Sequence, residues 1–175
     1  MAADPAFVFG DKWNAALTFE RFVEDAEQNV GLWEGVYRTV SIPGWAREEL
    51  HELGTDLRIL ILAEDWCGDA ANSVPVLAKL GAAAENVDVR ILKRDENPDV
   101  MDRYLTNGTR SIPIAILLDS QFNELGHWGP RPNELQRWVM ENKDTLSKEE
   151  RYPLVRRWYA KDKGESTLRE MLDIL

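Results

Sequence analysis

Leu57-Arg-Ile-Leu-Ile-Leu-Ala-Glu-Asp-Trp-Cys-Gly-Asp-Ala70 is the stretch of sequence that decides the fold. Its first seven residues form a nearly continuous aliphatic run, which is typical of a strand that is buried on both faces of a sheet. An alanine-rich segment follows, with Val74, Leu77 and Leu80 on one side, and this spacing predicts a helix that Pro75 would kink. We therefore expect a central strand that leads into a helix, with a cysteine at the junction.

Strands and helices continue to alternate after this junction. Aliphatic runs predict strands over Val87–Leu92, Ile112–Leu118 and Phe122–Trp128. Helices are expected between Asn97-Pro98 and Asn107-Gly108, and over Pro132–Glu141. This order predicts an α/β fold, a mixed β-sheet flanked by helices on both faces.

Helical segments extend the chain at both ends. We expect helices over Thr18–Asn29 with Thr18 as N-cap, over Trp45–Leu53 ending at Gly54, and over Ser147–Ala160 and Ser166–Leu175. The resulting division is an N-terminal helical extension (1–56), a core (57–142) and a C-terminal helical extension (143–175). The N-terminal extension is expected to pack on the core, because its aromatic residues carry more apolar surface than so short a segment could hide alone.

Composition excludes several classes of function. The net charge of −10 argues against nucleic acid and anionic membranes as partners, because phosphates bind cationic surfaces. A single cysteine permits no internal disulfide, and with two histidines it leaves a structural zinc site short of ligands. The longest apolar run is far too short for a membrane span, and the first residues lack the cationic start of a secretory signal. These features predict a cytoplasmic protein and leave its oligomeric state open.

Cys67 lies where a thiolate would gain most from its surroundings. The first turn of a helix presents free N–H groups and the positive end of the helix dipole, both of which lower a cysteine pKa. Glu64, Asp65 and Asp69 oppose this effect, because nearby carboxylates raise the pKa of a thiol. The sequence does not decide which effect is larger.

Several motifs share the order and spacing of one known family. Trp66-Cys-Gly68 follows an aliphatic strand, and Pro75 lies eight residues after Cys67. Arg94-Asp-Glu-Asn-Pro98 and then Arg110-Ser-Ile-Pro113 follow, and Gly129 lies 16 residues after Pro113. In these features the chain resembles the thioredoxin family over Leu57–Glu141. More narrowly, Glu64–Asp69 and Gly126-His-Trp-Gly-Pro-Arg-Pro132 resemble a bacterial subgroup of thioredoxin-like proteins with extra helices at both ends.

The resemblance implies a site as well as a fold. Pro113 would be a cis-proline beside Cys67, with the Ile112 backbone pairing with an extended substrate as an added strand. Trp66 would pack against and shield the sulfur. The substrate-binding residues implied by the resemblance are Gly68, Asp69, Ile112, Gly129, Pro130 and Arg131. Gly129, Pro130 and Arg131 would form the opposite lip, and Arg131 with Arg110 could bind a carboxylate of glutathione or of an acidic peptide.

Two departures from the family limit the expected chemistry. Ala70 stands where thioredoxins carry the resolving cysteine, and Ile61 stands where they bury an acid. Without a second thiol the protein cannot release its own mixed disulfide. The sequence therefore predicts monothiol thiol–disulfide exchange through Cys67, with an external thiol that resolves the intermediate and a protein or small-molecule thiol or disulfide as partner.

Alternative functions remain at this stage. A redox-inactive binding or adaptor module would need only the groove between Pro113 and Gly129, and glutathione-assisted carriage of a cluster or metal is a third possibility. No cofactor or resident metal is predicted, although glutathione is a possible co-substrate. Glu64 replaces the Thr or Ser of a one-cysteine peroxidase, and the chain is too short for a papain-like Cys67–His127 enzyme or for the helical domain of a glutathione transferase.

Overall fold

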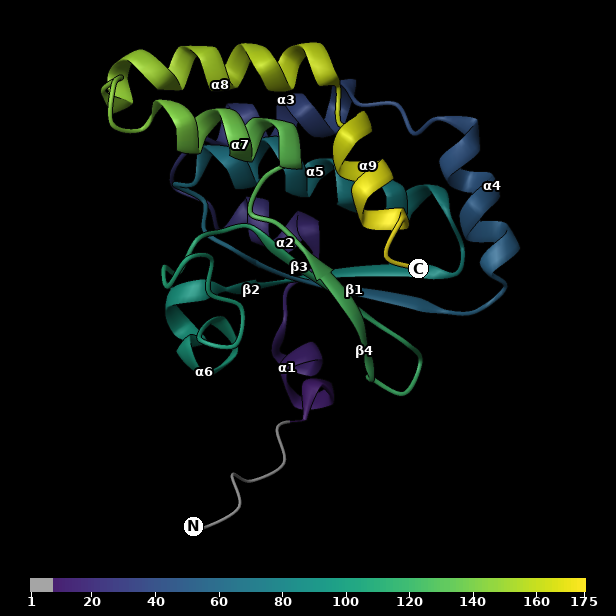
Figure 1. The fold of residues 1–175 in the computed structure, drawn as a ribbon. Coiled ribbons are helices and arrows are strands. Elements are labelled where there is room, and N and C mark those ends of the chain that lie inside the picture. Colours follow the sequence, from purple (N-terminus) through teal and green to yellow (C-terminus); the bar gives the residue numbers. More distant parts are fainter. Residues whose placement is uncertain (1–7) are drawn as a thin grey trace.

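A four-stranded mixed sheet forms the centre of the molecule, a computed structural model in which residues 8–175 are described (Figure 1). Its strands, in the order β2-β1-β3-β4, are β1 (Leu57–Ala63), β2 (Val87–Lys93), β3 (Ile114–Leu118) and β4 (Glu124–Trp128). β1 pairs parallel with β2 and antiparallel with β3, and β3 pairs antiparallel with β4. The predicted central strand is thus confirmed, and six of its seven residues are buried.

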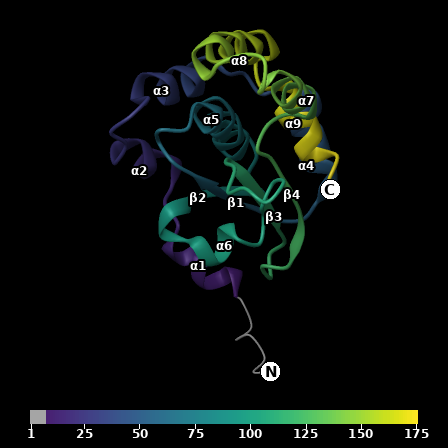
Figure 2. The same cartoon turned by 60° about the vertical axis from the view of Figure 1, so that its left-hand side comes forward.

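Helices cover both faces of this sheet, as the sequence predicted. They are α1 (Phe9–Ala15), α2 (Phe19–Glu24), α3 (Val30–Thr39), α4 (Gly44–Leu53), α5 (Gly68–Ala83), α6 (Pro98–Met101), α7 (Asn133–Asn142), α8 (Lys148–Asp162) and α9 (Glu165–Leu172), with a 3-10 turn η1 (Arg94–Glu96). Helices α3, α5, α7 and α8 lie on one side of the sheet, and α1 and α6 lie on the other (Figure 1, Figure 2). Figure 2 shows α8 as the outermost layer, beyond α5.

Some element boundaries differ from the sequence-based expectation. The helix that begins at the predicted N-cap Thr18 ends at Glu24, and a left-handed Asn29 then starts a separate helix, α3. The helix expected between residues 97 and 107 shrinks to α6, and the Asn97 side chain makes no cap and donates to the Lys93 carbonyl instead. Helix α1 was not predicted, because seven residues are too few to establish a helical period.

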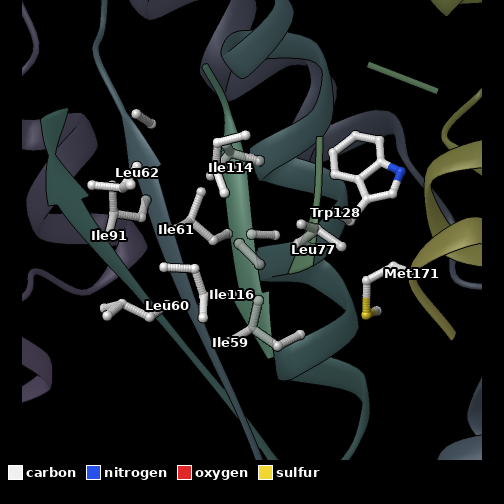
Figure 3. Packing of buried hydrophobic residues seen from close by; sticks show 14 of the residues in the cluster. Ile59, Leu60, Ile61, Leu62, Leu77, Ile91, Ile114, Ile116, Trp128 and Met171 are labelled. Carbon is white, nitrogen blue, oxygen red and sulfur yellow. The ribbon is translucent and has the colours of Figure 1, made fainter. Parts of the chain in front are cut away.

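The apolar core extends from the sheet into the N-terminal helices. Figure 3 shows buried side chains from both faces of the sheet: the strand register places Ile59 and Ile61 on one face, and Leu60, Leu62, Ile114 and Ile116 on the other. The same buried cluster includes aromatic residues of α1 to α3, namely Trp13, Phe19, Phe22 and Trp33. Residues 8–56 therefore share one core with the strands.

A backbone bridge also attaches the N-terminal helices to the sheet. Leu17 and Ile91 exchange two N–H to carbonyl hydrogen bonds of 2.8 Å, which covers part of the outer edge of β2. An uncovered edge strand exposes unpaired backbone groups, and the segment before α2 pairs some of those of β2.

Candidate functional site

Cys67 lies at the junction that the sequence singled out. It is the N-cap of α5, and its Sγ accepts a hydrogen bond from the Ala70 N–H at 3.4 Å. The same sulfur lies 3.5 Å from the carbonyl oxygen of Ile112, to which the thiol donates. The Ile112–Pro113 peptide bond is cis. Two segments 45 residues apart therefore meet at the sulfur.

The Gly129 backbone lies directly against this loop. Gly129 has a φ of +127°, and a Cβ atom at this position would collide with the carbonyl oxygen of Pro113. Only glycine fits such a conformation and such a close approach. The structure thus brings Cys67, Ile112, Pro113 and Gly129 together, and the buried Pro130 continues the chain through a second cis bond.

The thiol is protonated at neutral pH. Burial raises the pKa of Cys67 to about 11, outweighing the Ala70 N–H, which lowers it. Asp69 raises the pKa further, whereas Arg131 lowers it. Only 9% of the residue is exposed. The sequence left open whether the helix start lowers the thiol pKa more than its surroundings raise it, and in the structure the loss of hydration is the largest effect.

Two of the three carboxylates expected near the sulfur bind elsewhere. The buried Glu64 accepts the Asp95 N–H at 2.8 Å, and burial raises the pKa of its carboxyl. Asp65 accepts the N–H groups of Glu27 and Gln28 at 2.7 and 3.0 Å, so it holds the segment between α2 and α3.

Asp69 is the centre of a network that joins three helices. Its Oδ2 lies 2.8 Å from Nη2 of Arg131, and its Oδ1 accepts a hydrogen bond from the Tyr159 hydroxyl at 2.8 Å. Burial and the Asp69 charge raise the pKa of Tyr159, which stays a neutral donor. Arg131 also donates to Gln136 of α7 at 2.8 Å. Asp69 is therefore held by α8 and by the lip after β4.

Three predicted side-chain roles look different in the structure. Trp66 is 42% exposed, and the guanidinium of Arg94 lies 4.8 Å from the centre of its ring. Arg110 forms a two-pronged ion pair with Asp102, at 2.7 and 2.8 Å. Arg110 and Arg131, expected to bind a substrate carboxylate, thus each hold a carboxylate of the protein itself.

Sequence reasoning missed the wall of the site that α8 provides. A Cβ atom at Gly68 would lie 2.5 Å from the Tyr152 hydroxyl oxygen, so Tyr152 rests on the residue after Cys67. A cavity of about 210 Å³ opens beside them. It is lined by Gly68, Asp69, Asn72, Arg131, Val139, Lys148, Arg151, Tyr152, Val155 and Arg156. The signal in the sequence was the spacing of Lys148, Arg151, Tyr152, Val155 and Arg156, three or four residues apart on one helical face.

The described part of the chain also bears on metal and membrane binding. Within residues 8–175, no three His, Cys, Asp or Glu side chains are grouped closely enough to hold a metal ion. None of the helices in that range is long and apolar enough to cross a bilayer.

A buried strand, followed by a cysteine N-cap that faces a cis-proline loop, defines a thioredoxin-like site. A family model described as thioredoxin matches residues 16–148, and the chain belongs to this thioredoxin family. The matched segment ends at the first residue of α8. No curated protein matches the sequence.

Solved structures share the fold over nearly the whole chain. A protein of unknown function from Pseudomonas aeruginosa is similar at 20% identity with a TM-score of 0.77, and the match covers 96% of each chain. An HIV epitope scaffold is similar at 18% identity with a TM-score of 0.75, covering 96% of this chain and 97% of the scaffold. Both similarities extend through the helices at the two ends.

Proposed function

We propose that this protein carries out monothiol thiol–disulfide exchange through Cys67, with an external thiol resolving the mixed disulfide. The observation that carries the proposal is the position of Sγ, 3.4 Å from the Ala70 N–H and 3.5 Å from the Ile112 carbonyl. The N–H group stabilises a thiolate when the proton leaves. The Ile112 carbonyl, released by the departing proton, becomes available to an extended substrate segment.

Exchange at this site is slow near neutral pH. With a pKa of about 11, the thiol is ionised to roughly one part in 10⁴ at pH 7, against about 3% for free cysteine. A more basic thiolate is the better nucleophile, which recovers about a factor of 12, so the net rate is roughly 25-fold below that of free cysteine. The rate therefore grows with alkalinity.

Mass spectrometry with glutathione disulfide tests the proposal. The reduced protein should gain one glutathione by forming a Cys67–glutathione disulfide and releasing one glutathione thiolate, and added free thiol should reverse this. Cys67→Ser should gain nothing, since a hydroxyl is a far poorer nucleophile. Absence of the adduct at pH 9 in the unmodified protein would refute exchange.

Ala70→Cys provides a matched gain of function. The backbone N–H of residue 70 already lies 3.4 Å from the Cys67 sulfur, so a thiol there is one helical turn from the first. This variant should release bound glutathione without added thiol and end with an internal disulfide. If the variant retains glutathione as tightly as the unmodified protein, the geometry of resolution is wrong.

Burial of the sulfur favours a second candidate function, a redox-inactive binding module. The thiol is 9% exposed and protonated, and the loop at Pro113 and Gly129 presents its backbone without any need for a thiolate. Such a module should bind its partner equally well with Cys67→Ser. Loss of that binding would exclude the second candidate.

A further inference from the structure

The cavity beside Cys67 is strongly cationic in an acidic protein. Four cationic side chains, Arg131, Lys148, Arg151 and Arg156, line it against one carboxylate, Asp69, which leaves a local net charge of +3. The whole chain carries −10. A cationic concavity on an acidic surface concentrates anions and directs them to that place.

Most of this positive charge has no carboxylate partner within the described residues. Arg131 pairs with Asp69, but Nη1 of Arg151 donates to the carbonyl oxygens of Lys143 and Leu146, both at 2.7 Å. Carbonyl groups position this guanidinium without neutralising it. Among residues 8–175, no Asp or Glu oxygen lies within 4.0 Å of a charged nitrogen of Lys148, Arg151 or Arg156.

The cavity also has the size and the apolar wall that a short organic acid requires. Its volume is about 210 Å³, well above the roughly 30 Å³ of one water molecule. Val139, Val155 and Tyr152 provide apolar surface for methylene groups. Gly68 and Asp69, the two residues that follow Cys67 in the chain, are part of the lining and connect the cavity to the cysteine.

We infer that this cavity binds the carboxylate end of the molecule with which Cys67 exchanges, so that the substrates are small thiols and disulfides that carry carboxylates. The inference rests on the proposed function. In the reaction, the Cys67 thiolate forms a bond to one sulfur of the disulfide, whose S–S bond breaks and releases one carboxylate-bearing thiolate. An external thiolate then attacks the substrate sulfur, forms a new small disulfide and regenerates the Cys67 thiolate.

This assignment places α8 in the substrate site. The family match ends at residue 148, so Arg151 and Arg156 come from the segment that follows it. Lys148 and Arg156 are exposed, and their substitution leaves the core intact. The charge of these two residues can therefore be reversed without disturbing the fold.

Three disulfides of similar length and different charge test the inference. We would measure second-order rates of Cys67 with 3,3′-dithiodipropionate, bis(2-hydroxyethyl) disulfide and cystamine, each divided by the rate of N-acetylcysteine amide with the same compound. The normalised rate should be at least tenfold higher for the dianion than for the dication. The double variant Lys148→Glu with Arg156→Glu should reduce this ratio at least fivefold.

Arg137→Glu with Lys161→Glu is the matched control. It makes the same charge change at one exposed arginine and one exposed lysine of α7 and α8, outside the cavity. It should keep the anion preference, and high salt should weaken that preference in the unmodified protein. An equal loss of preference in both double variants, or no preference in the unmodified protein, would overturn the inference.

A binding measurement separates failure of the inference from failure of the proposed function. In Cys67→Ser, 3,3′-dithiodipropionate should shift the amide NMR signals of Gly68 and Tyr152, and the shifts should vanish with Lys148→Glu and Arg156→Glu. Shifts without exchange in the unmodified protein would refute the exchange function alone. Exchange without these shifts would refute the cavity as the binding site.

Discussion

Helices α3 and α8 both lie beside α5, yet the N-terminal helices and α8 attach to the rest of the molecule by different chemistry. Helices α1 to α3 bury large aromatic side chains in the core that surrounds the sheet, and Trp33 is fully buried. Helix α8 buries only Tyr159. It contacts the site through two tyrosine hydroxyl groups: that of Tyr159 donates to Asp69, and that of Tyr152 lies against Gly68. Apolar burial stabilises strongly without direction, whereas the polar contacts of α8 are few and directional. The comparison indicates that the N-terminal helices stabilise the fold and that α8 shapes the site.

Removing a core aromatic from α3 should cause the largest effect. Trp33→Ala deletes a fully buried side chain and the hydrogen bond of its Nε1 to the Asp65 carbonyl, 3.1 Å long. The free energy of unfolding should fall by about 3–5 kcal/mol, as measured by urea denaturation. Tyr152→Ala on α8 is the control, and its half-exposed ring should cost less than about 1 kcal/mol. Equal losses in the free energy of unfolding would contradict the conclusion that the N-terminal helices stabilise the fold more than α8 does.

Removing the hydroxyl that holds α8 should have an intermediate effect. Tyr159→Phe keeps the ring but deprives the Asp69 carboxylate of a donor at 2.8 Å. Because hydrogen bonds to charged groups contribute about 1.5–3 kcal/mol, the free energy of unfolding should fall by an amount in that range. Limited proteolysis should also cut α8 faster than α3. Unchanged protection of α8 would show that the helix is held by something other than this bond.

The reactivity of Cys67 should follow from its burial. At pH 7, iodoacetamide should modify Cys67 roughly 25-fold more slowly than free cysteine, since the ionised fraction is far smaller but the thiolate is more basic. The folded pKa of about 11 lies above the ordinary thiol value, so the rate should rise about tenfold per pH unit until it levels near pH 11. A plateau near pH 8.5 would show that the sulfur is solvated as in an unfolded chain.

Substitution of the two carboxylates Asp69 and Asp65 should cause the smallest change, and the alkylation rate of Cys67 should differ between the two variants. Asp69→Asn removes a charge that raises the Cys67 pKa and leaves Arg131 without its carboxylate, so the pKa should fall. A fall of the pKa by about 0.5 to 1 would make alkylation at pH 8 only about two- to fourfold faster, because the less basic thiolate is also the weaker nucleophile. Asp65→Asn should leave the alkylation rate unchanged, because that carboxylate binds the amides of Glu27 and Gln28. Equal acceleration in both variants would contradict the assignment of Asp69.

Local patterns were sufficient to predict the sheet and the position of the cysteine. The aliphatic run before Trp66 predicted β1, and the runs at residues 87–92 and 112–118 predicted its two neighbours. The strand after the Pro113 loop begins only at Ile114. Short elements were less predictable, since α1 and α6 span two turns or fewer and show no clear period.

The candidate site was predictable only in part. Cys67, Ile112, Pro113 and Gly129 lie together as the family resemblance implied. The directions of Asp65, Arg110 and Trp66 were not predictable, because each side chain is oriented by a partner that sequence proximity does not reveal. Asp65, for example, binds amides 37 and 38 residues away.

By itself, the sequence determined that a buried strand delivers one cysteine to a helix start and that no second thiol can resolve its disulfide. Period and composition are local properties, and both conclusions need only residues 57–70 and the count of cysteines. Only the tertiary structure decided the state of the thiol and the walls around it. Burial raises the pKa of Cys67, and Tyr159 reaches Asp69 from 90 residues further along the chain. Dehydration of a sulfur and contacts over such separations exist only once the helices pack, because both depend on which surfaces exclude water together.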